Sequence, residues 1–144
     1  MKFRRLSSTL ASVSLAIASF ASVSALTFVR QTAPAIAQEA APTVTTTSSI
    51  HEIALAKHLR KIGAKLYTAY WCPHCHSQKQ RFGSEAVKLL EVVECDRRGV
   101  NPQAQLCRDK KIRGYPTWEI NGKLYSGNRS LESLANFSKY RGNL

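Results

Sequence analysis

The sequence predicts a single α/β domain whose sheet mixes parallel and antiparallel strands, preceded by an export segment and a flexible linker. Its 144 residues suffice for one hydrophobic core but not for two ordinary ones. A strand, helix, strand order begins at Lys65, which indicates a βαβ unit with parallel strands. Further on, Asn121-Gly122 separates two short β-prone runs and predicts an antiparallel hairpin, because both residues tolerate a positive φ.

The first 37 residues have the pattern of a signal peptide or an N-terminal anchor. Lys2, Arg4 and Arg5 precede a mildly apolar, Ser- and Ala-rich stretch, and a small-residue cleavage pattern ends just before Gln38. If uncleaved, the stretch is long enough to span a bilayer, although its many serines weaken that case. Both outcomes place the domain outside the cytoplasm, in a periplasm or a thylakoid lumen, with membrane attachment only through this segment.

The composition of residues 38–49 predicts a flexible linker, because Ala, Pro, Thr and Ser dominate and nothing bulky recurs. The folded domain is then expected over residues 50–144. Loss of the export segment would leave 17 basic and nine acidic residues, a net charge of +8 in place of +12. The basic residues are scattered and not interleaved with aromatics, which argues against a nucleic-acid partner and favours a solvated surface.

The first half of the domain is predicted from caps and short apolar runs. Ser49 and Glu52 form a capping-box pattern before a helix that begins at Ile50 and ends at Gly63. Residues 65–70 are short and aromatic, which predicts a strand. Pro73 suits the first position of a second helix that runs to residue 83, and residues 84–90 are expected to continue it after a kink.

The second half alternates similarly. Residues 91–95 predict a second strand, and Asn101-Pro102 predicts the start of a helix that runs through Lys110. The hairpin strands are expected at residues 117–120 and 123–126, and Ser130 is expected to cap a last helix that ends near Tyr140. The predicted sheet therefore has about four strands, flanked by helices.

The chemistry is predicted at Cys72-Pro73-His74-Cys75, where a strand ends and a helix begins. Unpaired backbone N–H groups and the positive end of the helix dipole stabilise a thiolate there, so Cys72 is expected to be the attacking sulfur. Cys75 lies one turn further on the same helix face and can resolve a mixed disulfide formed by Cys72. His74 is expected either to stabilise the thiolate further or to be an exposed histidine without effect.

Several motifs in order resemble the thioredoxin-like domain that is fused behind bacterial vitamin K epoxide reductase homologues. They are Y-W-C-P-H-C at residues 70–75, V-E-C at 93–95, P-Q-A-Q-x-C at 102–107 and Y-P-T-W-x-I-N-G at 115–122. The resemblance implies a thioredoxin fold, a redox-active dithiol and a cis peptide bond before Pro116. Trp71 and Pro73 are expected to tune the site. Pro116 is expected either to present the backbone of Tyr115 beside Cys72, where an extended substrate could add as a strand, or merely to shape the entry to the next strand.

The same resemblance indicates the partners. The chain does not show the multi-helix membrane domain through which those homologues pass electrons to quinone. We therefore expect a separate membrane oxidoreductase of the vitamin K epoxide reductase type as redox partner, and cysteine-containing exported proteins as substrates. No cofactor is expected.

Cys95 and Cys107 are predicted to form a disulfide, because an even cysteine count in an exported protein favours pairing. We interpret this bridge as structural. A second redox pair that exchanges electrons with Cys75 is the alternative.

Two other classes of protein fit parts of the pattern. Cys72 to His76 matches C-x-x-C-H, the attachment motif of c-type haem, with His51 or His58 as the second axial ligand because the initiator is the only Met. A zinc module could instead use cysteines and a nearby histidine, although the second cysteine pair lacks C-x-x-C spacing. The strand and hairpin after the motif have no role in a small helical cytochrome.

Overall fold

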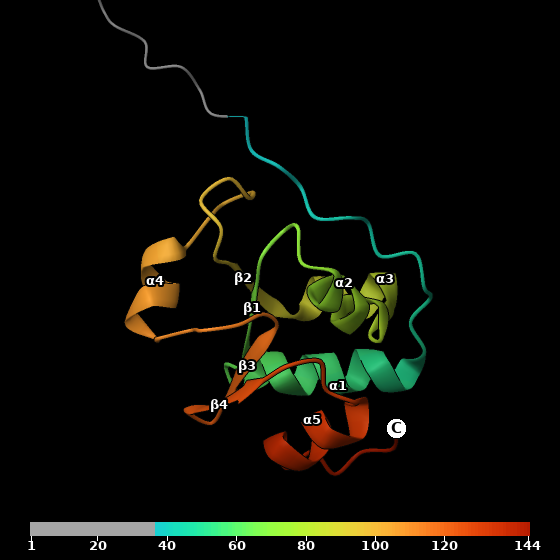
Figure 1. Cartoon of the computed structure of the whole chain (residues 1–144). Helices are drawn as coiled ribbons and strands as arrows, with labels where there is room; N and C mark the ends of the chain where they lie inside the picture. Colours follow the sequence, from blue (N-terminus) through green and yellow to red (C-terminus); the bar gives the residue numbers. More distant parts are fainter. Residues whose placement is uncertain (1–36) are drawn as a thin grey trace, which may run out of the picture. The chain divides into compact units, whose positions relative to one another are not determined.

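The computed structural model describes residues 37–144 (Figure 1). The predicted signal peptide or anchor, except for Ala37, lies outside the described residues. None of the helices within residues 37–144 has the length and apolar character needed to cross a bilayer.

The described chain forms a four-stranded mixed sheet flanked by helices. The elements in chain order are α1 (Ile50–Lys61), β1 (Lys65–Thr68), α2 (Pro73–Gln80), α3 (Gly83–Ala86), the 3-10 helix η1 (Val87–Leu89), β2 (Glu91–Glu94), α4 (Ala104–Asp109), β3 (Thr117–Ile120), β4 (Lys123–Ser126) and α5 (Leu131–Ser138). The strand order is β2-β1-β3-β4; β1 and β2 run parallel, and the other two pairs are antiparallel. The predicted α/β class and the thioredoxin-like fold are confirmed.

Local signals in the sequence act as predicted at several element ends. The Ser49 hydroxyl and the Glu52 carboxylate form a complete capping box at the start of α1. Gly63 adopts a φ of 70° just after α1, a conformation that favours glycine. At the hairpin, Asn121 and Gly122 have φ values of 50° and 75°, which the turn between β3 and β4 requires.

The sheet divides the core into two parts, because neighbouring residues of a strand face opposite sides. Leu66 of β1 packs in the larger part, together with side chains of α1, α3 and α5. Tyr67, the next residue, packs on the other face against α4 and the cysteines Cys95 and Cys107. Figure 1 shows α4 at one side of the sheet and α1 and α5 at the other. The strand β1 is therefore central to both layers and leads directly to the Cys72 loop.

The start of α4 differs from the prediction. The helix begins at Ala104, not at Pro102, and Asn101 has a φ of 50°, unlike the extended backbone typical of a helix N-cap. The backbone N–H of Gln103 donates to the carbonyl of Glu94 at 2.7 Å, so the chain before the helix stays beside the end of β2. This contact between the two segments places the start of α4 at Ala104 and outweighs the local preference of Asn101-Pro102.

Residues 39–48, which we call the N-terminal strap, are attached to the domain at both ends. The Glu39 N–H donates to the Arg98 carbonyl at 2.7 Å. At the other end, the Ser48 hydroxyl donates to the Phe82 carbonyl at 2.8 Å and accepts the N–H of Ala86 at 2.9 Å. The predicted linker therefore contains residues that cap α3, a structural role that its composition did not indicate.

Candidate functional site

The Cys72 side chain itself caps the helix α2. Cys72 is the N-cap residue, Pro73 occupies the first helical position, and the N–H of Cys75 donates to the Cys72 sulfur at 3.2 Å. A turn closed by the Cys72 N–H and the Ala69 carbonyl at 3.0 Å brings the chain from β1 into this position. A sulfur at an N-cap receives the N–H groups and the dipole field that stabilise a thiolate over a thiol.

Cys75 is held in the protonated form by its surroundings. Its side chain is 1% exposed, and burial, with a further contribution from the hydrogen bond to Cys72, raises the pKa of Cys75 to about 12. The two cysteines are unbonded in this structure, which therefore shows the dithiol form. These surroundings therefore disfavour a negative charge on Cys75, while the roles of attacking and resolving sulfur stay a prediction.

The peptide bond between Tyr115 and Pro116 is cis, as the resemblance implied. The carbonyl of Tyr115 lies 3.7 Å from the Cys72 sulfur and accepts its S–H. The loop is held on both sides, because the Thr117 hydroxyl donates to Gly114 at 2.8 Å and the Gly127 N–H donates to Pro116 at 2.7 Å. The structure therefore brings Tyr115 and Pro116 next to Cys72, while their role toward a substrate stays a prediction.

Trp71 forms the exposed wall beside the dithiol. Its side chain is 56% exposed, its ring meets that of Tyr115 edge-on with 6.3 Å between centroids, and its indole N–H donates to Asp96 at 2.8 Å. The Arg98 N–H, and after it the Trp71 indole, lower the pKa of Asp96. Asp96 was not predicted from the sequence, in which its one signal is an acidic residue directly after Cys95.

His74 lies on the surface of α2, and the structure gives it no hydrogen bond within residues 37–144. Its predicted effect on the thiolate stays a prediction. The neighbouring His76 is half-buried, and its Nε2 lies 3.0 Å from the amide nitrogen of Gln80.

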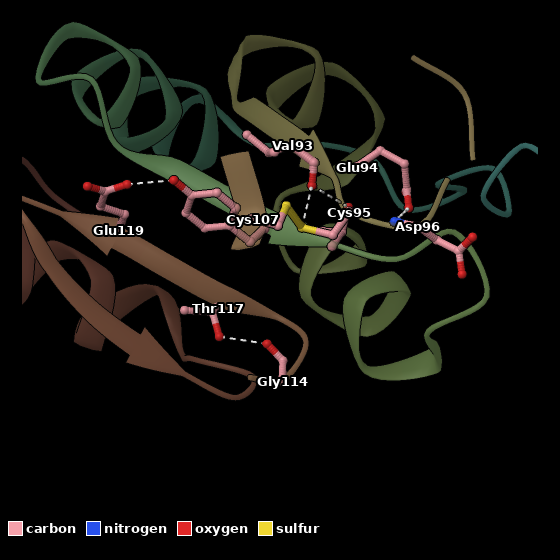
Figure 2. Close-up of a disulfide and its surroundings, with 10 residues drawn as sticks. Val93, Glu94, Cys95, Asp96, Cys107, Gly114, Thr117 and Glu119 are labelled. Atoms are coloured by element: carbon pink, nitrogen blue, oxygen red, sulfur yellow. Dashed lines mark hydrogen bonds between the residues drawn. A yellow bond between two sulfur atoms is a disulfide. The ribbon is translucent and has the colours of Figure 1, made fainter. Parts of the chain in front are cut away.

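Cys95 and Cys107 form the predicted disulfide, with 5.8 Å between their Cα atoms (Figure 2). The bridge connects the end of β2 to α4 and is buried with Tyr67 and Val93. Tyr115 packs against this cluster and also against the cluster of Cys72 and Cys75. The two cysteine pairs are thus separate groups that share one aromatic neighbour.

The two alternative classes of protein fit this arrangement poorly. The disulfide removes Cys95 and Cys107 from a zinc site, and within residues 37–144 no group of three or more suitable ligands gathers. For haem, the Nε2 atom that an axial histidine would offer to iron is occupied in His76 by the contact with Gln80.

The fold and the site define a thioredoxin-fold domain with a dithiol at a helix N-terminus, a cis-proline loop opposite the dithiol and a separate buried disulfide. No known family model matches the chain. Over 100 residues, or 67% of its length, the chain is 46% identical to a protein of Arabidopsis thaliana named thiol-disulfide oxidoreductase LTO1. The match spans 27% of that relative, so the chain corresponds to about a quarter of it.

Proposed function

We propose that this domain is a thiol-disulfide oxidoreductase that exchanges disulfides with cysteine-containing proteins outside the cytoplasm. The main support for the proposal is the hydrogen bond from the Cys75 N–H to the Cys72 sulfur. This bond would stabilise a thiolate at Cys72, while burial favours the protonated form of Cys75. The likeness to a plant protein named as a thiol-disulfide oxidoreductase supports the same activity.

The proposed reaction is a sequence of two thiolate exchanges. The Cys72 thiolate attacks one sulfur of a substrate disulfide, which forms a mixed disulfide and releases the other substrate sulfur as a thiolate. Cys75 then loses its proton and attacks the Cys72 sulfur, so the second substrate sulfur leaves and the Cys72–Cys75 disulfide forms. The reverse sequence transfers that disulfide to a substrate dithiol.

The finer assignment is a relative of the thioredoxin-like domain found behind vitamin K epoxide reductase homologues. The motif order from Trp71 to Pro116 supports it. A separate membrane protein of that reductase type would then exchange disulfides with Cys72 and pass the electrons to quinone. The periplasm or the thylakoid lumen is the proposed location, since a buried disulfide persists in an oxidising compartment.

A trapping experiment tests the activity. In a Cys75→Ala variant of the full chain, nothing resolves the mixed disulfide, so adducts with exported proteins should accumulate and disappear with dithiothreitol. The variant with both Cys72→Ala and Cys75→Ala is the matched control and should trap nothing. Absence of adducts from the Cys75→Ala variant, or equal adducts in the control, would contradict the proposal.

The redox partner is tested with the same variant in membranes from the source cells. The variant is expected to form a covalent adduct with an integral membrane protein. In the wild type, quinone depletion should shift Cys72 and Cys75 toward the dithiol. If a soluble thioredoxin of the same compartment alone sets their redox state, the proposed partner is wrong.

A further inference from the structure

Gln80, the last residue of α2, joins the N-terminal strap to the helix that carries the dithiol. Its side-chain oxygen accepts the backbone N–H groups of Thr45 and Thr46, each at 3.1 Å. Its backbone carbonyl accepts the Thr46 hydroxyl at 2.6 Å, and its amide nitrogen donates to the Thr45 hydroxyl at 3.2 Å. The strap therefore depends on one side chain for most of its contacts with α2.

These contacts also fix the orientation of the Gln80 amide. Two backbone N–H donors require the oxygen on the strap side, so the NH₂ group must face His76, whose Nε2 lies 3.0 Å away. A ring nitrogen that faces a donor must accept, which leaves the proton of His76 on Nδ1. The imidazole is then neutral, because its charged form would place an N–H against the NH₂ group.

His76 lies in the first turn of α2, the helix that Cys72 caps. It directly follows Cys75, and its backbone N–H donates to the Cys72 carbonyl at 3.1 Å. Its Nδ1 is buried and has no hydrogen-bond partner within residues 37–144. An unpaired buried donor is unfavourable, and Nδ1 has no partner that would itself hold a proton there. The contact between Gln80 and Nε2 is therefore what keeps the proton on Nδ1.

We infer that Gln80 is a positioning residue that anchors the N-terminal strap to α2 and keeps His76 uncharged beside the dithiol. The inference rests on the proposed dithiol chemistry at Cys72 and Cys75. An imidazolium at residue 76 would stabilise a neighbouring thiolate and so favour the dithiol over the disulfide. Gln80 thus favours the disulfide form by withholding that charge.

Two variants of the full chain separate the two effects of Gln80. Gln80→Ala removes every side-chain contact, so the Thr45 and Thr46 amides should exchange hydrogen about tenfold faster or more. Gln80→Glu keeps an acceptor for those amides but offers His76 an acceptor in place of a donor. His76 should then carry protons on both nitrogens while the strap stays protected.

The measurements are nitrogen NMR of the His76 ring, amide exchange of the strap and the thiol-disulfide equilibrium with glutathione. Wild-type His76 should show a protonated Nδ1 and an unprotonated Nε2. In Gln80→Ala, which removes the donor that faces His76 Nε2 and adds no carboxylate, the equilibrium at pH 6 should move toward the dithiol by about threefold or more. Gln105→Ala is the matched control, a glutamine on exposed α4 that bonds only Asp109 and Arg108.

Each outcome decides the inference. A wild-type His76 with its proton on Nε2 overturns the tautomer, and unchanged strap exchange in Gln80→Ala overturns the anchor. An unchanged glutathione equilibrium in Gln80→Ala at pH 6 overturns the link to the dithiol. If wild-type Cys72 and Cys75 form no disulfide with glutathione at all, the proposed function fails, while the tautomer and exchange results still test the anchor.

Discussion

Replacing both Cys95 and Cys107 with Ala tests whether their bridge is structural. The bridge joins residues 12 apart, and closing such a loop in the unfolded chain stabilises the fold by about 3 kcal/mol. Both cysteines are also buried, at 7% and 4% exposure, so removal of their sulfurs should add about 1 kcal/mol of lost packing. The expected loss in the free energy of unfolding is therefore about 4 kcal/mol.

Urea unfolding of the full chain without reductant measures that loss. In a domain of about 100 residues, a loss of 4 kcal/mol in the free energy of unfolding should also lower the melting temperature on heating by about 15 °C or more. The variant with Cys72→Ala and Cys75→Ala removes two buried sulfurs that are not bonded in this structure, and should lose far less.

The same variant decides between a structural bridge and a second redox pair. If the bridge is structural, Cys72 should exchange with glutathione at nearly the wild-type rate in the folded double variant of Cys95 and Cys107. A variant with native circular dichroism but no exchange would refute the reasoning. Tyr115, which packs against both cysteine pairs, would then be the first residue to test as a connection.

Two further predictions concern Cys75 and Gly83. Because the pKa of Cys75 is raised to about 12, a rising pH should not charge it until far above the free-thiol value of about 8.5. At pH 8 iodoacetamide should therefore modify Cys72 and leave Cys75 about 1000-fold less reactive than a free thiol, and preferential modification of Cys75 would reverse the roles. Gly83→Ala should cost about 2 kcal/mol or more, because φ is 81° and a Cβ would lie 2.6 Å from the Ser48 nitrogen. Gly122→Ala, with a φ of 75° and open space, should cost about 1 kcal/mol, and equal losses in urea unfolding would contradict the close approach.

The sequence predicted those features that depend on a few neighbouring residues. The capping box of Ser49, the hairpin turn at Asn121 and the position of Cys72 as N-cap all follow from local hydrogen bonding and backbone preference. The cis bond before Pro116 has a weak local signal, and only the resemblance of the surrounding motif indicated it.

What the sequence did not reveal depends on residues far apart in the chain. Thr46 and Gln80 are separated by 34 positions, and a Thr-rich segment has the same composition whether or not it finds an acceptor. Asp96 likewise gains its role only because the fold brings Trp71 within 2.8 Å of it. Hydrophobic periodicity carries no information on such polar pairs, since the residues involved are largely exposed.

The anchor of Glu39 at Arg98 determines where anything joined to the N-terminal side of the domain will emerge. That loop also holds Asp96, which binds Trp71, so a protein fused before residue 39 would stand at the rim of the dithiol. Each residue of a spacer adds at most about 3.5 Å, so a spacer of a few residues would not carry the fused protein past that rim. The other end of the chain is different, because Asn143 lies beside His51 of α1, 3.3 Å from its ring. A reporter or an immobilising tag should therefore be placed after Leu144, so that it does not adjoin the Trp71 side of the dithiol.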